Sequence, residues 1–240
     1  MSQKSLTIMQ LYPDDMNIYG DWGNALTLLK RIQWHGYEAK LVNHNEGDVF
    51  DKNVDIIIGG GGQDSGQLKV QDDLQTIAPL LKELIEDGTP MLMICGMYQL
   101  FGKFFKTKDG QVIPGIGIFD AETHGGLERL IGNITLESAQ FGDIIGYENH
   151  SGQTFLGKTA KPLGKVIRGA GNNGHDETEG ILLGNAIGTY LHGSILPKNP
   201  RLADFLIEQA ALKKYGEFTP TVIEDRFAQE AREIAKKRPR

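Results

Sequence analysis

The stretch that decides the fold is TPMLMICGMYQLFG, residues 89–102. Its apolar run, residues 91–94, shows no alternation of polar and apolar side chains, which is typical of a strand buried on both faces. Gly96 permits a sharp turn directly after Cys95, and the apolar residues that follow are spaced as in the first turns of a helix. The stretch therefore predicts a strand, a turn that carries a thiol, and a helix.

Such a turn favours a reactive cysteine. The N–H groups and the positive end of the dipole at the start of a helix stabilise a thiolate over a thiol, and a sharp strand-to-helix turn lifts a nucleophile out of the sheet. A cysteine between methionine and isoleucine can also be a small core residue. The flanking turn leads us to predict that Cys95 is a nucleophile.

Strands and helices alternate before this stretch. We expect strands at 6–11, 38–42 and 54–58, a helix at 24–35, and one helix or two at 68–86. This alternation predicts an α/β fold of the flavodoxin type, in which a mostly parallel central sheet carries helices on both faces.

After residue 102 the pattern changes to short strands and turns. We expect short strands, mainly antiparallel, at 117–119, 133–137, 143–146 and 165–167, a polar loop outside the core at 169–180, a last strand pair at 181–183 and 187–191, and a helix at 200–214. The sequence thus predicts one domain over residues 1–214 and a charged helical arm over 215–240.

Composition excludes several classes of function. The net charge of −6 with interspersed charges offers no basic face for nucleic acid. A single cysteine excludes an intrachain disulfide, and the apolar run at the N-terminus is too short for a signal peptide or a membrane helix. We therefore expect a cytoplasmic protein with a reduced thiol, and we predict no metal site.

A cysteine nucleophile needs a base, and His192 is the best candidate among six histidines. It ends a predicted strand, as Cys95 does, and active groups collect at the carboxyl ends of parallel strands. A turn histidine bonded to the backbone is the alternative.

The remaining histidines are assigned elsewhere. We interpret His35, His44 and His175 as surface residues because they lie in helix-end or loop contexts. His150 lies in the polar segment GYENHSG, which we interpret as a hydrogen-bonded loop rather than a pocket wall.

The glycine run 59–62 supplies backbone donors with little side-chain bulk. Attack on an amide creates an oxyanion, and we predict that the N–H groups of Gly60 or Gly61 stabilise it together with those of Gly96 or Met97. A phosphate loop or a dinucleotide site is the rival interpretation. No Gly-Lys-Ser/Thr follows, however, and the run does not fit G-x-G-x-x-G.

The ordered set of motifs resembles a known family. MICGMYQ (93–99), the glycine run followed by Gln63-Asp64, GYENH (146–150) and GTYLHG (188–193) are similar to the class I glutamine amidotransferases. Within that class they resemble the cobyric acid synthase-like branch and, most closely, the GatD-type glutaminase subunits of lipid II isoglutaminyl synthase. The resemblance covers roughly residues 5–212.

This resemblance implies a reaction. Cys95 attacks the side-chain amide of L-glutamine to give a thioester and ammonia, and His192 acts as base and then as acid. The ammonia passes to a MurT-like, Mur-ligase-type partner that amidates the α-carboxyl of D-glutamate in the lipid II stem peptide. No cofactor is implied in this chain, and ATP and Mg²⁺ are expected on the partner.

The resemblance also assigns Arg129 to the α-carboxylate of glutamine, which a guanidinium can bind through two donors. From the residues alone, Arg129 would be a surface residue in an ion pair.

The sequence departs from many class I members at one position. Their catalytic histidine is followed two residues later by a glutamate that orients it, whereas this chain has Ser194. Cobyric acid synthase-like members lack that glutamate too. Without an acid to orient the imidazole, the rate of catalysis falls. We therefore hypothesise that the partner supplies the acid, or that assembly repositions one from this chain.

Two other functions stay open at this point. One is a stand-alone cysteine γ-glutamyl hydrolase of the same fold. The other is a non-catalytic binding subunit, in which replacement of Cys95 would leave the complex active with glutamine.

Overall fold

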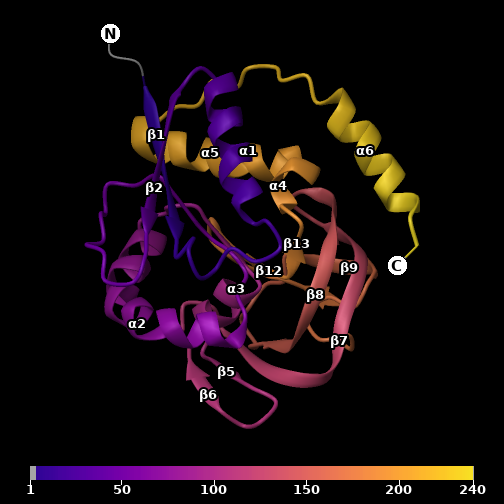
Figure 1. The fold of residues 1–240 in the computed structure, drawn as a ribbon. Helices are drawn as coiled ribbons and strands as arrows, with labels where there is room; N and C mark the ends of the chain where they lie inside the picture. Colours follow the sequence, from indigo (N-terminus) through magenta and orange to yellow (C-terminus); the bar gives the residue numbers. More distant parts are fainter. Residues whose placement is uncertain (1–3, 240) are drawn as a thin grey trace.

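The computed structural model describes residues 4–239, which form two β-sheets with helices packed around the first (Figure 1). The first sheet has the strand order β11-β12-β4-β3-β1-β2, and every neighbouring pair except β11 and β12 is parallel. Its strands are β1 (Ser5–Leu11), β2 (Glu38–His44), β3 (Ile56–Gly59), β4 (Met91–Ile94), β11 (Ile181–Leu183) and β12 (Ala186–Thr189). The predicted α/β class is confirmed.

Helices cover both faces of this sheet, as predicted. α1 (Trp22–Trp34) and α5 (Pro200–Tyr215) lie on one face, and α2 (Asp64–Glu86) and α3 (Gly96–Phe101) lie on the other (Figure 1). The α2 segment is one continuous helix although it contains Pro79. Its buried apolar side chains recur at helical spacing on one side, and this packing outweighs the cost of the proline.

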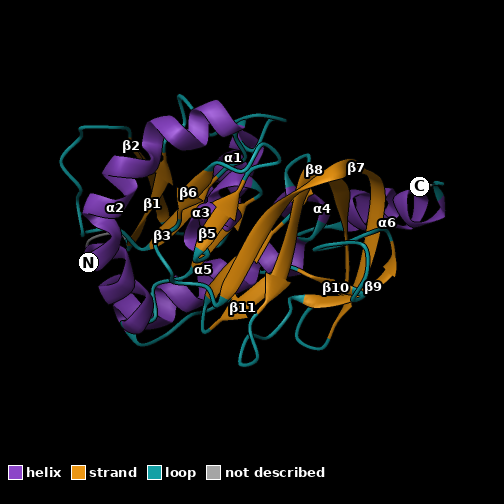
Figure 2. Ribbon diagram, turned by 90° about the horizontal axis from the view of Figure 1, so that it is seen from below, coloured by secondary structure: helices purple, strands orange, loops and turns teal. Residues whose placement is uncertain are grey.

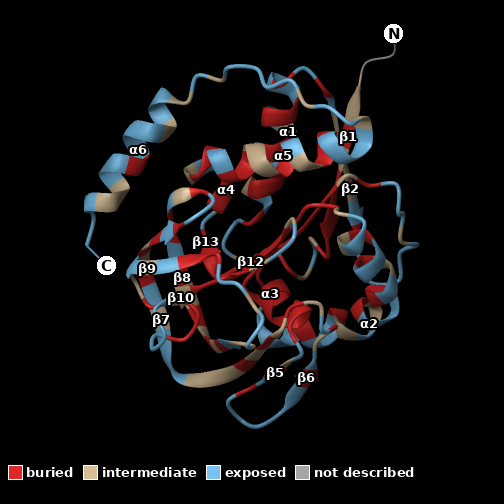
Figure 3. Cartoon of the chain, turned by 180° about the vertical axis from the view of Figure 1, so that it is seen from behind, coloured by how far each residue is buried: buried red, intermediate tan, exposed pale blue. Residues whose placement is uncertain are grey.

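The central strands carry the core. Every residue of β3 and β4 is buried, as the uninterrupted apolar runs predicted. Figure 3 shows buried residues concentrated in the middle of the molecule. Burial of each such aliphatic side chain stabilises the fold by about 1.5–3 kcal/mol. Packing therefore fixes the positions of these two strands and of the residues at their carboxyl ends.

The second sheet is built on a long hairpin. β7 (Ala121–Ser138) pairs antiparallel with β8 (Gly142–Leu156), and both strands curve along the sheet (Figure 2). The remaining strands are β5 (Phe104–Lys106), β6 (Val112–Pro114), β9 (Gly164–Arg168), β10 (Thr178–Glu179) and β13 (Leu191–His192).

The predicted short strands at 133–137 and 143–146 are only the part of this hairpin next to its turn. Much of β7 and β8 is polar, so the local pattern carries no strand signal there. Pairing with the opposite strand supplies the backbone hydrogen bonds instead, and a register shift between Gly125 and Leu130 accommodates the glycine-rich part of β7.

The last predicted strand, 187–191, is also divided. β12 pairs with β4 in the first sheet, whereas β13 pairs with β8 in the second, and Tyr190 lies between them. His192 in β13 therefore stands where the chain passes from one sheet to the other.

Two histidines that we expected on the surface are buried. His44 is 1% exposed and its Nε2 lies 2.9 Å from the Asp73 carboxylate. His35 is 7% exposed and its Nε2 lies 3.2 Å from Asp204. His35 stands at the end of α1, as predicted, whereas His44 is the last residue of β2 rather than part of a loop. A carboxylate from a distant element contacts each imidazole. The surface assignment holds for His175.

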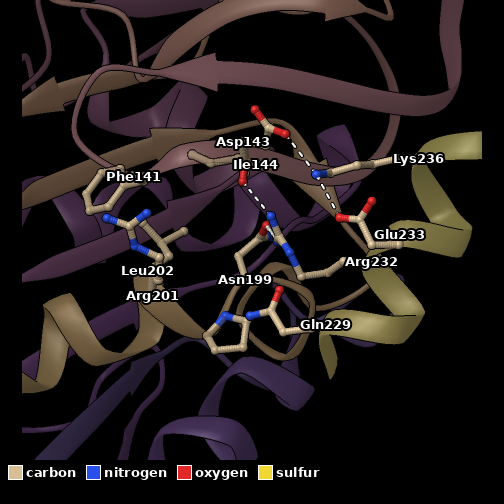
Figure 4. A pocket seen from close by; sticks show the side chains of 11 residues that line it. Phe141, Asp143, Ile144, Asn199, Arg201, Leu202, Gln229, Arg232, Glu233 and Lys236 are labelled. Carbon is tan, nitrogen blue, oxygen red and sulfur yellow. Dashed lines mark hydrogen bonds and ion pairs between the residues drawn. The ribbon is translucent and has the colours of Figure 1, made fainter. Parts of the chain in front are cut away.

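The C-terminal segment returns to the domain through α6 (Arg226–Lys237). Figure 4 shows Arg232 reaching from α6 toward Asp143 and Asn199. Its guanidinium donates to the carbonyl oxygens of Lys198 and Asp143, each at 2.6 Å, and to Asn199 Oδ1 at 2.5 Å. A cavity of about 200 Å³ lies beside these contacts. The arm is thus held against β8 and α4 (Ile195–Lys198) by one buried arginine.

Replacement of Arg232 by alanine is expected to lower the free energy of unfolding by about 2 kcal/mol, because three acceptors lose a charged donor. For a chain of this size, that loss lowers the melting temperature by about 4–8 °C in a thermal scan. Lys236→Ala is the control, since its ion pair with Asp143 is solvent-accessible and is worth about 0–1 kcal/mol. Equal melting temperatures for all three proteins would contradict the role given to Arg232.

Within residues 4–239, none of the helices has the length and apolar character needed to cross a membrane.

Candidate active site

Cys95 stands at the predicted turn between β4 and α3. Its backbone has φ 49° and ψ −103°, a region that costs a non-glycine residue energy and that folds keep at functional turns. Its N–H donates to the Thr189 carbonyl at 2.8 Å, which ties the turn to the end of β12. The residue is 7% exposed and lines a cavity. The strand, turn and helix around the thiol are confirmed.

The structure brings Cys95, His192 and the glycine run together. A Cβ atom added to Gly61 would lie 2.7 Å from His192 Cε1 and 3.3 Å from Cys95 Cβ. Only a glycine leaves both side chains in place here, because the first distance is shorter than any normal carbon contact. These residues come from β13, the β4–α3 turn and the segment after β3, and they meet at the carboxyl ends of the parallel strands.

The imidazole of His192 is 1% exposed and has the sulfur of Cys95 and the carboxylate of Asp21 as neighbours. Burial alone would lower its pKa, but the sulfur of Cys95 and the carboxylate of Asp21 raise the pKa of His192 to about 10. At neutral pH the ring is therefore held in its charged form. A buried imidazolium beside a thiol favours the thiolate.

Asp21 is the residue that the sequence interpretation missed. Its carboxylate is 2% exposed, and Oδ1 lies 3.6 Å from His192 Nδ1. The sequence pattern predicts no element and no site residue between residues 12 and 22. An available signal was an aspartate at the residue before α1, where acids are favoured. That signal would have predicted that Asp21 caps the helix. This role would have been wrong, because the structure shows no cap hydrogen bond from this side chain to the described residues.

The cavity beside Cys95 has a volume of about 390 Å³, within the range of small-molecule sites. It lies between the glycine run, α2 and α3 on one side and the β7–β8 hairpin on the other. Its polar lining includes Tyr19, Gln63, Asp64, Ser65, Gln67, Gln99, Arg129, Asn149, His150 and Ser151. Such a lining suits a small ligand with several charged or amide groups.

Arg129 lines this cavity from β7. Its Nε donates to Asn149 Oδ1 at 2.5 Å, and Nη2 donates to the Tyr19 hydroxyl at 2.7 Å. The Tyr19 ring in turn packs edge-on against His192, with 4.8 Å between the ring centroids. Arg129 is exposed, and its side-chain partners in the described part of the chain are Asn149 and Tyr19 rather than a carboxylate. Tyr19 connects the guanidinium to the imidazole.

The predicted oxyanion donors differ in their surroundings. The N–H of Gly61 donates to Asp21 Oδ2 at 2.7 Å, and the N–H of Met97 points at the Gly60 carbonyl at 3.3 Å. These two amides already have acceptors in this state of the chain. Gly96 begins α3 directly after the thiol. The donor roles of Gly60, Gly61, Gly96 and Met97 stay predictions.

His150 lies in strand β8 and lines the cavity, so its assignment to a loop rather than a pocket wall was wrong. The pairing of β8 with β7 and β13 extends the sheet through the polar motif. The ring stacks on Tyr190 at 3.6 Å and 5°, and Nδ1 donates to the Gly152 carbonyl at 2.6 Å. Burial lowers the pKa of His150 to about 3, and this outweighs the raising effect of the bond to Gly152. The ring is therefore neutral at pH 7.

The polar loop at 169–180 is exposed at residues 174–177 but buried at residues 170–173 and 179–180, contrary to expectation. Its backbone amides at Ala170 and Gly171 donate to the fully buried Glu148 carboxylate. Within the same loop, Glu179 accepts from the Tyr190 N–H at 2.7 Å. Burial raises the pKa of Glu179 to about 8, although this hydrogen bond opposes the shift. The loop thus supports the break between β12 and β13 that positions His192.

No cluster of three or more His, Cys, Asp or Glu side chains with metal-binding geometry occurs among residues 4–239. Cys95 lines the cavity, and His192 and then Asp21 lie buried behind it. A thiolate with a neighbouring proton donor can attack a carbonyl carbon and protonate the group that leaves.

Two curated relatives align with nearly the whole chain. The chain is 42% identical over 231 residues to the lipid II isoglutaminyl synthase (glutamine-hydrolyzing) subunit GatD of Staphylococcus aureus (strain N315), covering 95% of this chain and 94% of that protein. It is 38% identical over 215 residues to the subunit of the same name from Streptococcus pneumoniae (strain R6), covering 88% of this chain and 83% of that protein.

Solved structures of low sequence identity share the fold. One glutamine amidotransferase crystal structure superposes with a TM-score of 0.58 at 18% identity, covering 85% of this chain and 98% of that chain. A glutamine amidotransferase from Thermotoga maritima gives 0.56 at 14% identity, covering 96% and 93%. The family model described as the CobB/CobQ-like glutamine amidotransferase domain matches residues 7–200. The chain therefore belongs to the CobB/CobQ-like glutamine amidotransferase family.

Proposed function

We propose that this chain is the glutamine-hydrolysing subunit of a lipid II isoglutaminyl synthase. The observation that carries the proposal is the end-to-end similarity to two subunits of that name. The cavity supports the same reading, since Cys95 and His192 meet beside polar side chains that suit an amino acid.

In the proposed reaction the Cys95 thiolate attacks the side-chain carbonyl carbon of glutamine. The carbonyl electrons move to oxygen, and collapse of the tetrahedral intermediate breaks the C–N bond while the His192 imidazolium gives its proton to the leaving nitrogen. Ammonia and a γ-glutamyl thioester result. His192, now neutral, removes a proton from water, which attacks the thioester and releases glutamate and the thiolate.

Arg129 is proposed to bind the α-carboxylate of glutamine. Its two hydrogen bonds to Asn149 and Tyr19 hold the guanidinium in one orientation, which lowers the ordering cost of binding. The opposite charge of the α-carboxylate complements the guanidinium at the wall of the same cavity as Cys95.

Arg129→Lys is expected to raise KM for glutamine about 10–100-fold with little change in kcat, because a lysine keeps the charge but loses the paired donors. Initial rates over a range of glutamine concentrations measure both constants. Arg201→Lys, in the other cavity, is the control and should leave both constants unchanged. A fall in kcat at constant KM would contradict substrate binding by Arg129.

The ammonia acceptor would lie on a partner subunit. By the resemblance, that partner is a MurT-like ligase that binds ATP and Mg²⁺ and amidates the α-carboxyl of D-glutamate in the lipid II stem peptide. A cytoplasmic location suits this step, because the precursor is built inside the cell.

The test is to purify the tagged chain from its native host and identify the co-purifying protein by intact mass. The reconstituted pair is then supplied with ATP, lipid II and glutamine labelled with ¹⁵N in its side-chain amide. The expected result is a Mur-ligase-like partner and ¹⁵N in the amidated stem peptide. Failure of the label to appear while free ammonia supports amidation would overturn the proposal. So would efficient hydrolysis of γ-glutamyl peptides by the chain without any partner.

A further inference from the structure

We propose that Asp21 is the positioning acid of His192, holding the imidazole with Nδ1 toward its carboxylate and Nε2 free for the Cys95 sulfur. The inference rests on the proposed function and adds a residue to the same site. It answers the question raised by Ser194, which stands where many relatives of this class carry an orienting glutamate.

The two oxygens of Asp21 have different partners. Oδ2 accepts the Gly61 N–H at 2.7 Å, whereas Oδ1 makes no hydrogen bond within residues 4–239 and faces His192 Nδ1 at 3.6 Å. Both side chains are at most 2% exposed. A buried carboxylate with an unsatisfied oxygen is costly unless an opposite charge lies next to it. The His192 imidazolium is at ion-pair distance and supplies that charge.

The arrangement selects one role for each ring nitrogen. A carboxylate beside Nδ1 keeps the proton on that nitrogen whenever the ring is neutral, so Nε2 carries the lone pair. Nε2 is then the atom that exchanges protons with the sulfur, the leaving nitrogen and water. The 3.6 Å separation is longer than a hydrogen bond, and such contacts in unliganded sites tighten when substrate binds.

The backbone around Asp21 is shaped for this position. Tyr19 and Gly20 both have positive φ, 63° and 78°, which turns the chain sharply before the aspartate. A Cβ atom on Gly60 would lie only 3.1 Å from the Asp21 Cβ. The carboxylate makes no hydrogen bond to the start of α1, although it precedes that helix. The Asp21 side chain therefore does not cap the helix; it contacts Gly61 and faces His192 instead.

Other titratable groups act on His192 or on Asp21. The sulfur of Cys95 raises the pKa of His192 most, and Glu179 in β10 and His150 in β8 interact electrostatically with the imidazole from the same sheet as β13. Lys198 lies near Asp21, and burial lowers the pKa of Lys198 while Asp21 opposes that shift. The effect of Asp21 must therefore be measured with the sulfur removed.

The experiment is a pH titration of the histidine ring signals by NMR, on the full chain labelled with ¹⁵N-histidine. Cys95→Ser is compared with Cys95→Ser/Asp21→Asn, and His192→Gln assigns the signal. Because an opposite charge nearby raises a histidine pKa, the Asp21→Asn change is expected to lower the His192 midpoint by about 1–3 pH units. Asparagine can still accept the Gly61 N–H, so the turn is retained.

Asp73→Asn is the matched control, because it removes a carboxylate from another buried imidazole, His44. It should move the His44 signal and leave His192 in place. An unchanged His192 midpoint in the Asp21→Asn protein would overturn the inference. A shift that occurs only after a partner is bound would also overturn it, since the orienting charge would then come from the complex.

Kinetics provide a second measurement. With Cys95 restored and the partner present, Asp21→Asn is expected to lower kcat for glutamine hydrolysis about 10²–10⁴-fold with little change in KM. Asp21→Glu should recover part of the rate, and equal losses in both variants would contradict a positioning role. The two proposals can fail separately. A wild-type complex that never hydrolyses glutamine would contradict the proposed function. The NMR shift tests the pairing of Asp21 with His192 independently of that activity.

Discussion

Cys95→Ser is expected to abolish glutamine-dependent amidation, with a loss of about 10⁴-fold or more in kcat. Serine has the same shape, but at neutral pH its hydroxyl does not ionise beside the His192 imidazolium as a thiol does. The charge pair that raises the pKa of His192 is lost together with the nucleophile. Ammonia release from glutamine by the reconstituted pair measures the effect.

The same variant should keep full amidation with free ammonia, because the ligase chemistry belongs to the partner. That result separates loss of the nucleophile from loss of assembly. Iodoacetamide should label the wild-type chain at its single cysteine near neutral pH and block glutamine use but not ammonia use. Glutamine-dependent activity that survives in Cys95→Ser would show that this thiol is not the nucleophile.

His192→Gln is expected to lower kcat about 10³-fold or more, since both proton transfers at the thioester lose their acid or base. Glutamine keeps a polar group of similar reach, so the cavity should persist and KM should change little. His44→Gln is the control, because His44 is equally buried and pairs with a carboxylate outside the cavity. Comparable kcat losses in the two variants would point to a general folding defect.

The pH dependence of stability gives an independent check on His192. Its folded-state pKa, about 10, lies above the ordinary value of about 6.5. The stabilisation from the charged ring is therefore fully present below about pH 6.5 and is lost as the pH rises through about 10. Melting temperatures measured across that interval should fall more steeply for the wild type than for His192→Gln. Parallel curves would contradict the raised pKa.

Local patterns predicted the α/β class, the turn at Cys95 and the strand-end position of His192. Each depends on a signal contained in a few neighbouring residues. The unbroken apolar run of β4 requires burial on both faces, and the glycine after Cys95 permits the turn. Such signals act within one element, so the chain displays them without its neighbours.

The long hairpin β7–β8 could not be predicted in the same way. The polar motif around His150 becomes a strand only because β7 and β13 provide hydrogen bonds from residues far away in sequence. The burial of the 169–180 loop has the same origin, since the Glu148 carboxylate satisfies its amides. Backbone N–H and C=O groups can be buried only where they have hydrogen-bond partners, and the tertiary structure determines which groups become partners.

The sequence by itself determined the fold class, the thiol at its turn and the histidine most suited to reach it. Only the tertiary structure decided that β13 leaves the first sheet, that the Gly61 N–H is bound to a carboxylate, and that this carboxylate faces His192. The physical reason is the distance along the chain over which each effect acts. Propensity, hydrophobic periodicity and turn chemistry act over a few residues, whereas the contact of Asp21 with His192 joins positions 171 residues apart and exists only after two sheets have packed.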